Sequence, residues 1–302
     1  MLTILGCGAI GSTIAQQCFI NQIDFNVLLK PANFAQSPNK LLYFTDINKQ
    51  KFAIPLSPAS QTVTNLIVTV KAYQVETAIN QLRQQQMIAA DANIVLLHNG
   101  MGTKAIVEAL LPKANVLLAT TTYAAYSQQK LDVVQTGIGQ LQIENPFANI
   151  NECNERFAVI NQLIGVWSQA SWQANINEIL WQKLFINCVI NPLTAIHQVK
   201  NGQLRESRFS AEIHELLAEI YQISAHVCPA LSDAEIKQTV YEVIDKTADN
   251  YSSMNRDIAN NRKTEIDFIS GFLLQTAAEL SVDLPKHQAL YKQIKHLETS
   301  NS

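Results

Sequence analysis

The first part of the chain alternates short apolar runs with segments of helical period. Apolar runs typical of buried strands occupy residues 2–5, 25–29, 66–70, 93–97 and 116–121. Segments whose apolar residues recur every three or four positions lie at 8–21, 74–85 and 104–111. Buried strands separated by helices indicate right-handed βαβ units. The pattern therefore predicts an α/β domain, a Rossmann-like doubly wound sheet with helices on both faces.

The rest of this region shows weaker patterns of strands and helices. Short strands are expected at 41–44, 51–55 and 171–173, a helix at 154–167, and an added antiparallel hairpin formed by 132–136 and 139–144. Thr103 is suited to cap the helix that begins at Lys104.

Strand signals cease around Ala174, and the remaining pattern is helical. Helices are expected at 177–191, 210–227, 232–249, 265–280 and 285–296. Ser232 and Glu235 have the spacing of a capping box for the third of these. We therefore expect two domains, a nucleotide-binding domain at 1–174 and an all-α domain at 175–302. No low-complexity linker separates them, so we expect a close interface with a cleft.

One apolar helix carries an unusual polar stripe. Lys183, Asn187 and Asn191 are spaced i, i+4 and i+8 in WQKLFINCVINPLT, so they share one helical face. Buried ammonium and carboxamide groups cost free energy unless they find partners, which favours a face that lines a cleft. The alternative is that Lys183 reaches solvent while the Asn side chains cap neighbouring loops. Pro192 should kink or end the helix near Asn191.

Composition and charge narrow the class of protein. The chain has 302 residues, 47% hydrophobic and 16% charged, with a net charge of −3. This suits globular domains without a broad basic field, so we expect no nucleic-acid or membrane partner. Its five cysteines lack CxxC spacing, which favours free thiols in a reducing compartment and neither a disulfide nor a metal site. No signal peptide is visible, and we expect a cytoplasmic protein.

The first strand leads directly into a glycine-rich loop. Gly6-Cys7-Gly8-Ala9-Ile10-Gly11 is a GxGxxG sequence between a strand and a helix, the arrangement that brings backbone N–H groups to a pyrophosphate. The alternative is an ordinary glycine turn. The second strand ends at Lys30, where an NAD-selective fold would carry an acid. A cation there favours the 2′-phosphate of NADP, unless Lys30 is a solvated surface residue.

Other polar residues also follow strands. Lys71, Asn99 and the segment 122–125 come at strand ends, where ligands of such sheets bind. Their shared location is stronger support for a nucleotide site than any single residue.

Together these motifs resemble the 2-dehydropantoate 2-reductase (ketopantoate reductase) family. The resemblance spans nearly the whole chain and rests on GCGAIG, TVKAYQ, HNGMGT, WQKLFINCVINPLTAI and SSMNRDIANNRKTEIDFISGFLL. It implies reduction of 2-dehydropantoate to (R)-pantoate with NADPH, in pantothenate and coenzyme A biosynthesis. The family commonly has Arg at the position of Lys30. The cation still favours NADP over NAD, but the lysine leaves open how strong that preference is.

The resemblance also implies roles for individual residues. Lys183 would be the catalytic acid and Glu265 its partner near the cofactor. The substrate would contact Asn99, Asn187, Asn191, Asn201 and Ser253. The cofactor would contact Gly6, Cys7, Gly8, Ala9, Ile10, Gly11, Lys30, Lys71, Asn99, Ala125 and Glu265. Glu265 could also serve as a first-turn acid of its own helix.

The chemistry requires these residue types. Hydride transfer to a ketone builds negative charge on oxygen, which an ammonium can neutralise by donating a proton. Two alternatives stay open: another NADP-linked dehydrogenase of a 2-oxo acid, a 3-hydroxy acid or an opine, and a regulator that binds NADP(H) without turnover. The expected partner is a small-molecule substrate, and the expected assembly is a monomer or homodimer.

Overall fold

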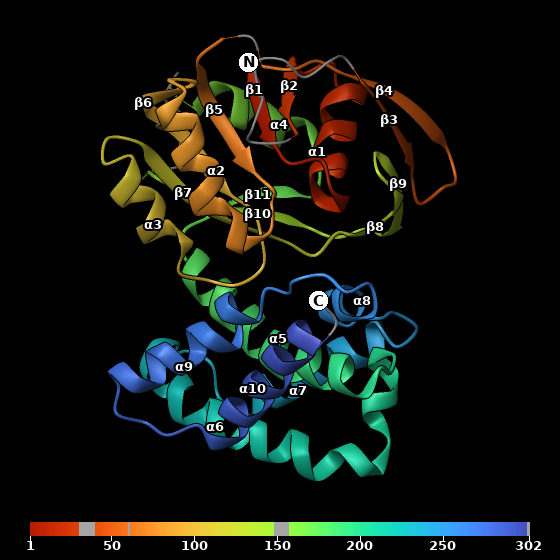
Figure 1. Cartoon of the computed structure of the whole chain (residues 1–302), viewed down its shortest axis with the longest axis vertical. Coiled ribbons are helices and arrows are strands. Elements are labelled where there is room, and N and C mark those ends of the chain that lie inside the picture. Colours follow the sequence, from red (N-terminus) through yellow and green to blue (C-terminus); the bar gives the residue numbers. More distant parts are fainter. Residues whose placement is uncertain (30–39, 60, 148–156, 301–302) are drawn as a thin grey trace. The chain divides into compact units, whose positions relative to one another are not determined.

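The computed structural model describes residues 1–29, 40–59, 61–147 and 157–300, and its contacts divide the chain into two compact units (Figure 1). Unit 1 comprises Met1–His98 and Gly102–Ile176, and unit 2 comprises Asn99–Met101 and Asn177–Ser302. The short segment 99–101 thus belongs to the helical unit by its contacts, although it directly follows a strand of unit 1.

A seven-stranded sheet in the order β11-β10-β7-β6-β5-β1-β2 is the centre of unit 1. Its strands are β1 (Leu2–Leu5), β2 (Phe25–Leu28), β5 (Val63–Val68), β6 (Ile88–Leu96), β7 (Asn115–Thr121), β10 (Leu141–Glu144) and β11 (Ala170–Gln173). The five strands from β7 to β2 run parallel to one another. β10 runs antiparallel to β7, and β11 is parallel to β10. The predicted doubly wound sheet is confirmed.

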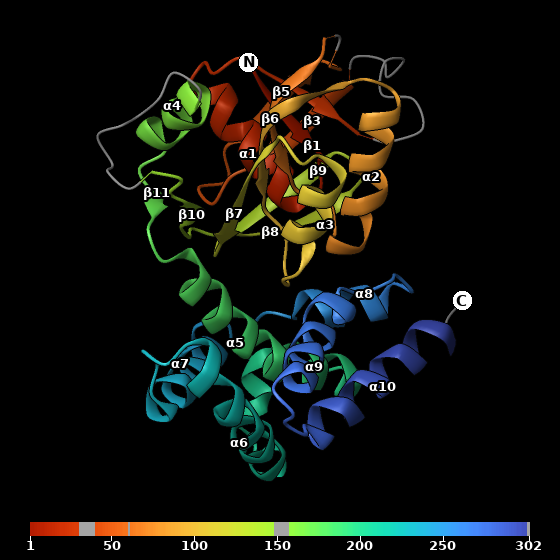
Figure 2. The ribbon, with the colours of Figure 1, turned by 90° about the vertical axis from the view of Figure 1, so that its left-hand side faces the viewer.

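Helices cover both faces of this sheet (Figure 2). α1 (Ala9–Ile20) and α4 (Ala158–Val166) pack on one face, and α2 (Ala72–Gln84) and α3 (Thr103–Leu110) on the other. Ile4 faces the first pair of helices and Leu5 the second, because successive strand residues point to opposite faces. A sheet buried on both faces requires almost continuous apolar strands, which is why the sequence pattern was readable.

A second, four-stranded sheet in the order β4-β3-β9-β8 was not expected. Its strands are β3 (Lys40–Thr45), β4 (Lys51–Leu56), β8 (Ala124–Gln129) and β9 (Asp132–Gly137). Phe44, Ile54 and Val133 from this sheet join the cluster that contains α1 residues such as Ile14. The second sheet therefore buries its inner face against α1.

The predicted hairpin of 132–136 with 139–144 is wrong. β9 pairs with β8 and β3, whereas β10 pairs with β7 and β11 in the larger sheet. The chain passes between the two sheets at Gly139, where an added Cβ would lie 2.3 Å from the carbonyl carbon of Thr122. Alternation of apolar residues identified both strands but carries no information about their partners.

Unit 2 contains helices throughout its described part. They are α5 (Ile176–His197), α6 (Ser210–Val227), α7 (Asp233–Lys246), α8 (Ser253–Ala259), α9 (Ser270–Glu279) and α10 (Pro285–Ser300), with short 3-10 turns η3 (Asn201–Arg205), η4 (Ser207–Phe209) and η5 (Ile266–Phe268). One core unites them, including Phe185 of α5, Leu216 of α6 and Ile294 of α10, all fully buried. Burial of each such side chain contributes about 1.5–3 kcal/mol. Ser232 caps α7 as predicted, with Glu235 N–H donating to its hydroxyl at 3.3 Å.

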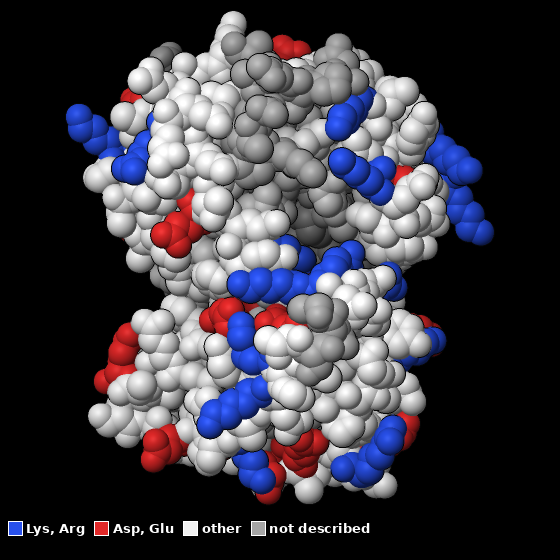
Figure 3. Space-filling view, viewed as in Figure 1, with Lys and Arg blue, Asp and Glu red and all other residues white. Residues whose placement is uncertain are grey.

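α5 is the one helix in the described residues that is long and apolar enough to cross a membrane. Two thirds of its apolar window, 67%, is buried inside the protein, as for the core helix of a folded domain. Acidic and basic side chains are interspersed over unit 2 on the face shown in Figure 3.

Several predicted details of the helices are wrong. α5 does not end near Asn191 but continues through Pro192 to His197, because packing in the core outweighs the lost hydrogen bond. The cap of α3 is Gly102, with φ of +98°, and the Thr103 hydroxyl instead lies 2.8 Å from His98 Nε2. The helix expected at 265–280 is divided into η5 and α9, and the sequence pattern missed α8.

Candidate active site

The glycine loop joins β1 to α1 and is fixed by contacts with two neighbouring strands. Gly6 has φ of +93°, its N–H donates to Leu28 O at 2.9 Å, and its carbonyl accepts from the Thr69 hydroxyl at 2.9 Å. A Cβ on Gly11 would lie 2.2 Å from the Gly6 carbonyl oxygen. Packing within the protein therefore demands glycine at both positions.

Gly8 differs from the other two loop glycines. A Cβ built there meets no protein atom within 4 Å, so packing within the chain does not require glycine at this position. Gly8 also precedes the first residue of α1, where unpaired backbone N–H groups favour an anion. A glycine that the protein's own packing does not need, at a helix start, fits the close approach of a dinucleotide pyrophosphate.

The remaining loop residues act through the backbone or the core. Ile10 packs against the core cluster of unit 1, and Ala9 begins α1. Burial raises the pKa of the Cys7 thiol to about 11, while its contact with the Ser12 hydroxyl opposes the rise. Cys7 is therefore a neutral thiol at physiological pH rather than a nucleophile.

The other predicted cofactor residues follow neighbouring parallel strands. Lys71, after β5, is the N-cap of α2, and Asn99 comes after β6. Parallel strands end at one edge of the sheet. The chain adds β2 on one side of β1 and then β5 on the other, so the winding reverses between β1 and β5, where ligands of such folds bind. Ala125 lies in β8 of the second sheet. Lys30 lies outside the described residues.

Lys183 and Glu265 come together in unit 2 from distant parts of the sequence. Burial lowers the pKa of the half-buried Lys183 to about 8, and the nearby carboxylate of Glu265 opposes this fall. Glu265 is 4% exposed and precedes η5. Asn99 Nδ2 donates to Glu265 Oε2 at 3.5 Å, and Met101 N–H donates to Phe268 O at 2.9 Å. The segment 99–101 is thereby attached to η5.

Four of the five predicted substrate residues lie on three elements of unit 2, and the fifth, Asn99, lies in the segment 99–101. Asn187 is half-buried and Asn191 buried on α5, Asn201 begins η3, and Ser253 is exposed at the start of α8. Asn201 is 7% exposed and donates from Nδ2 to Thr247 Oγ1 at 2.8 Å. Its Oδ1 is buried without a hydrogen-bond partner in the described part of the chain. Such an acceptor is stabilised by a ligand that brings a donor.

Sequence reasoning missed a buried polar cluster that links α5 to α8. The Thr194 hydroxyl donates to Ser252 Oγ at 2.8 Å and lies 3.1 Å from Asn191 O. Asn255 Nδ2 donates to Thr194 O at 2.6 Å. These bonds fix the backbone beside Asn191 and Ser253. The signal in the sequence was Ser252 three residues before Asn255, a helix N-cap that went unrecognised.

The four cysteines in the described residues, Cys7, Cys18, Cys188 and Cys228, are free, and Cys153 lies outside them.

Comparison with known proteins identifies close relatives along the whole chain. The model of the family described as "Ketopantoate reductase PanE/ApbA" matches residues 2–146, and that of its C-terminal domain matches residues 175–298. The 2-dehydropantoate 2-reductase of Vibrio cholerae is 37% identical over 236 residues, 78% of each chain. That of Escherichia coli O157:H7 is 31% identical over 99% of this chain and 95% of its own.

Solved structures share the fold at lower sequence identity. D-mandelate dehydrogenase, determined with NADH and anilino(oxo)acetate, matches with a TM-score of 0.87 at 22% identity, covering 100% of this chain and 99% of its own. The dimeric ketopantoate reductase of Staphylococcus aureus matches with a TM-score of 0.83 at 20% identity and the same coverage. The two family models and the curated relatives establish that the chain is a member of the ketopantoate reductase family of oxidoreductases.

Proposed function

We propose that this oxidoreductase reduces 2-dehydropantoate to (R)-pantoate with NADPH, a step of pantothenate and coenzyme A biosynthesis. The observation that carries the proposal is the Lys183–Glu265 pair, because a lysine with a pKa of about 8 is an effective proton donor near neutral pH. The curated relatives with this activity support the choice of substrate.

The cofactor would be held chiefly by unit 1. Gly6 to Gly11 would receive the pyrophosphate and Lys30 the 2′-phosphate. Lys71 and Asn99 would lie beside the ribose and nicotinamide, Ala125 would contact the cofactor through its backbone, and Glu265 would lie near both Lys183 and the cofactor. When bound, the reduced nicotinamide supplies the hydride.

Lys183 supplies the proton that completes the reduction. Hydride addition forms a new C–H bond at C2 of the 2-oxo acid and moves the π-electron pair of its C=O bond onto the oxygen, and the Lys183 ammonium donates a proton to that oxygen as the charge develops. At pH 7, one unit below a pKa of about 8, about nine tenths of Lys183 is protonated. Glu265 favours the ammonium form and, through the Asn99 hydrogen bond at 3.5 Å, couples Lys183 to segment 99–101.

The polar groups of the substrate match the neutral side chains around this pair. 2-Dehydropantoate carries a carboxylate and a hydroxyl, which suit hydrogen bonds with Asn187, Asn191 and Ser253. The buried, unpartnered Oδ1 of Asn201 is an acceptor for which a substrate hydroxyl is a suitable donor. We further propose that the enzyme works in the cytoplasm, as a monomer or homodimer.

Two other functions remain alternatives. Another 2-oxo acid, 3-hydroxy acid or opine dehydrogenase would share the fold, as D-mandelate dehydrogenase does. A regulator would bind NADP(H) without turnover, but it would have no need for a lysine of lowered pKa beside a buried Glu.

The deciding experiment compares catalytic efficiencies. NADPH oxidation would be measured with 2-dehydropantoate, pyruvate, 2-oxoisovalerate, 2-oxopantolactone and phenylglyoxylate, and repeated with NADH. We expect kcat/KM to be highest for 2-dehydropantoate with NADPH. Equal efficiency with another 2-oxo acid would overturn the substrate assignment, and NADPH binding without turnover of any substrate would favour the regulator.

A further inference from the structure

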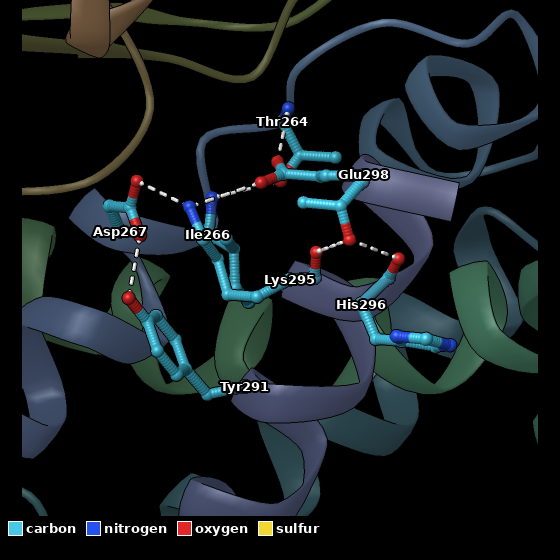
Figure 4. A network of polar contacts seen from close by, with 8 residues as sticks. Thr264, Ile266, Asp267, Tyr291, Lys295, His296 and Glu298 are labelled. Carbon is cyan, nitrogen blue, oxygen red and sulfur yellow. Dashed lines mark hydrogen bonds and ion pairs between the residues drawn. The ribbon is translucent and has the colours of Figure 1, made fainter. Parts of the chain in front are cut away.

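A network of hydrogen bonds and ion pairs surrounds the segment that carries Glu265 (Figure 4). Glu298 of α10 accepts at Oε1 from the backbone N–H and the hydroxyl of Thr264, both at 2.7 Å. Thr264 immediately precedes Glu265 and is 1% exposed. The residue before the proposed catalytic carboxylate is therefore fixed twice by one side chain of a different helix.

The same network holds the other side of Glu265. The Tyr291 hydroxyl donates to Asp267 Oδ1 at 2.7 Å, and Lys295 Nζ lies 3.0 Å from Asp267 Oδ2. Lys295 also pairs with Glu298 Oε2 at 3.1 Å, which joins the two halves of the network. Residues 264 and 267 are thus both bound to α10, with Glu265 between them.

We propose that Glu298, Lys295 and Tyr291 of α10 are positioning residues for catalysis, which hold the Thr264–Asp267 segment so that the Glu265 carboxylate is directed at Lys183. The inference rests on the proposed function for the role of the Lys183–Glu265 pair, and extends it to residues of α10. It assigns α10 a catalytic purpose beyond core packing.

Glu265 precedes a short turn, which explains why its segment needs the bonds to α10. η5 is a single turn of three residues, and its N-cap, Glu265, makes no side-chain cap hydrogen bond. A short turn alone holds its residues weakly, because few backbone hydrogen bonds fix it. Glu298 is well suited to the task, since its side chain is 8% exposed and its two oxygens serve Thr264 and Lys295 separately.

The charged groups around the pair lie on three parts of unit 2. They are Lys183 on α5, Lys263, Glu265 and Asp267 on the segment around η5, and Lys295 and Glu298 on α10. Burial raises the pKa of Asp267, but bonds from Tyr291 and Lys295 outweigh it and hold the pKa below its usual value. Asp267 therefore stays ionised and keeps its bonds to α10 throughout the neutral range.

The test compares Glu298→Ala and Glu298→Gln with a matched control on the same helix. The control is Thr299→Ala, whose hydroxyl donates within the described residues to carbonyls of α10, at Lys295 and His296. Two readouts are taken: kcat/KM for 2-dehydropantoate, and the pKa of Lys183 from NMR titration of protein carrying 13Cε-lysine, with the signal assigned by its loss in Lys183→Arg. The titration requires no substrate.

We expect Glu298→Ala to lower kcat/KM by about tenfold to a hundredfold, as small misplacements of catalytic groups do. The Lys183 pKa should fall, because a loosened Glu265 carboxylate supports the ammonium less. Glu298→Gln should lose less, since it keeps an oxygen acceptor for Thr264, and Thr299→Ala should match the wild type. In a Glu265→Gln background, Glu298→Ala should move the Lys183 pKa no further.

A folded Glu298→Ala protein with an unchanged Lys183 titration and kcat/KM within about twofold of the wild type would overturn the inference. If Glu298→Ala does not fold, Glu298→Gln and Tyr291→Phe decide the matter by the same two readouts. Failure of the proposed function is distinguishable. A chain that turns over no 2-dehydropantoate while Glu298→Ala still shifts the Lys183 pKa would refute the substrate and keep the positioning role.

Discussion

The rate of reduction should depend on pH through one group, Lys183. In the wild-type enzyme, kcat/KM for 2-dehydropantoate should be level toward neutral pH and fall above a pKa of about 8. Loss of a required proton lowers the rate tenfold per pH unit, so the rate should be about tenfold lower at pH 9 and a hundredfold lower at pH 10. A lysine of ordinary pKa, about 10.4, would keep the rate nearly constant to pH 9.

The carboxylate of Glu265 should set the position of this alkaline limb. Glu265 raises the pKa of Lys183, so Glu265→Gln should lower it. A nearby opposite charge shifts a pKa by about 1–3 units, which places the limb of the variant between about pH 5 and 7. Lowering the pH below 7 should therefore raise the activity of Glu265→Gln, whereas the activity of the wild type should stay level.

Two further variants make the assay decisive. In Lys183→Arg the guanidinium stays charged, so the limb should disappear from a slow enzyme. Glu242→Gln, which removes an exposed carboxylate on α7 paired with Lys246, is the matched control and should leave the limb unchanged. A primary kinetic isotope effect measured with deuterated NADPH would check that hydride transfer limits kcat/KM. A limb that Glu265→Gln does not move, or that persists in Lys183→Arg, would refute the reasoning.

Other consequences can be tested separately. Gly11→Ala should lower the melting temperature, because its Cβ would lie 2.2 Å from the Gly6 carbonyl oxygen, whereas Gly8→Ala should keep the fold and weaken NADPH binding; equal stability of the two would contradict this, as would unchanged NADPH affinity in Gly8→Ala. Lys30→Glu should shrink or reverse the preference for NADPH, expected to be about tenfold to a hundredfold from one charged hydrogen bond, and a wild type that uses NADH equally well would exclude that role. Burial raises the pKa of Glu219, but hydrogen bonds from His287 and Lys286 outweigh this effect and keep the pKa below its usual value. The stabilisation that Glu219 gives the folded protein is therefore fully present above the pKa of the unfolded state, and it is lost as the pH falls through the pKa of the folded state. Glu219→Ala should lower the free energy of unfolding by about 2–4 kcal/mol at pH 7 and by less in acid, and an equal loss at both pH values would be inconsistent with this pairing.

Local patterns predicted the parts of the fold that local physics determines. β1 and β5 were readable because both faces of the sheet are buried, and the capping box of α7 because Ser232 and Glu235 interact within one turn. The partners of β9 and β10 were not, because pairing depends on the bodies against which a strand packs. The continuation of α5 through Pro192 was also not predictable from the local sequence, because it is stabilised by the core contacts of the helix.

Some residues of the candidate site could likewise be predicted from the sequence, and others could not. Lys183, Asn187 and Asn191 were visible because helical spacing places them on one face. The Glu298 network was not, because Thr264 and Glu298 are 34 positions apart and meet only when α10 packs against η5. Neither residue has an unusual sequence context, so only the tertiary structure identifies the contact.

Single-turnover hydride transfer by Lys183→Ala tests the central claim most directly. NADPH oxidation would be followed by rapid mixing with saturating 2-dehydropantoate, beside NADPH affinity and thermal stability. The account predicts a transfer rate reduced by roughly a hundredfold to ten-thousandfold, nearly intact NADPH binding, and a Lys183→Ala/Glu265→Ala double variant little slower than Lys183→Ala, since the two residues act as one unit. A folded Lys183→Ala enzyme that transfers hydride at the wild-type rate would contradict it.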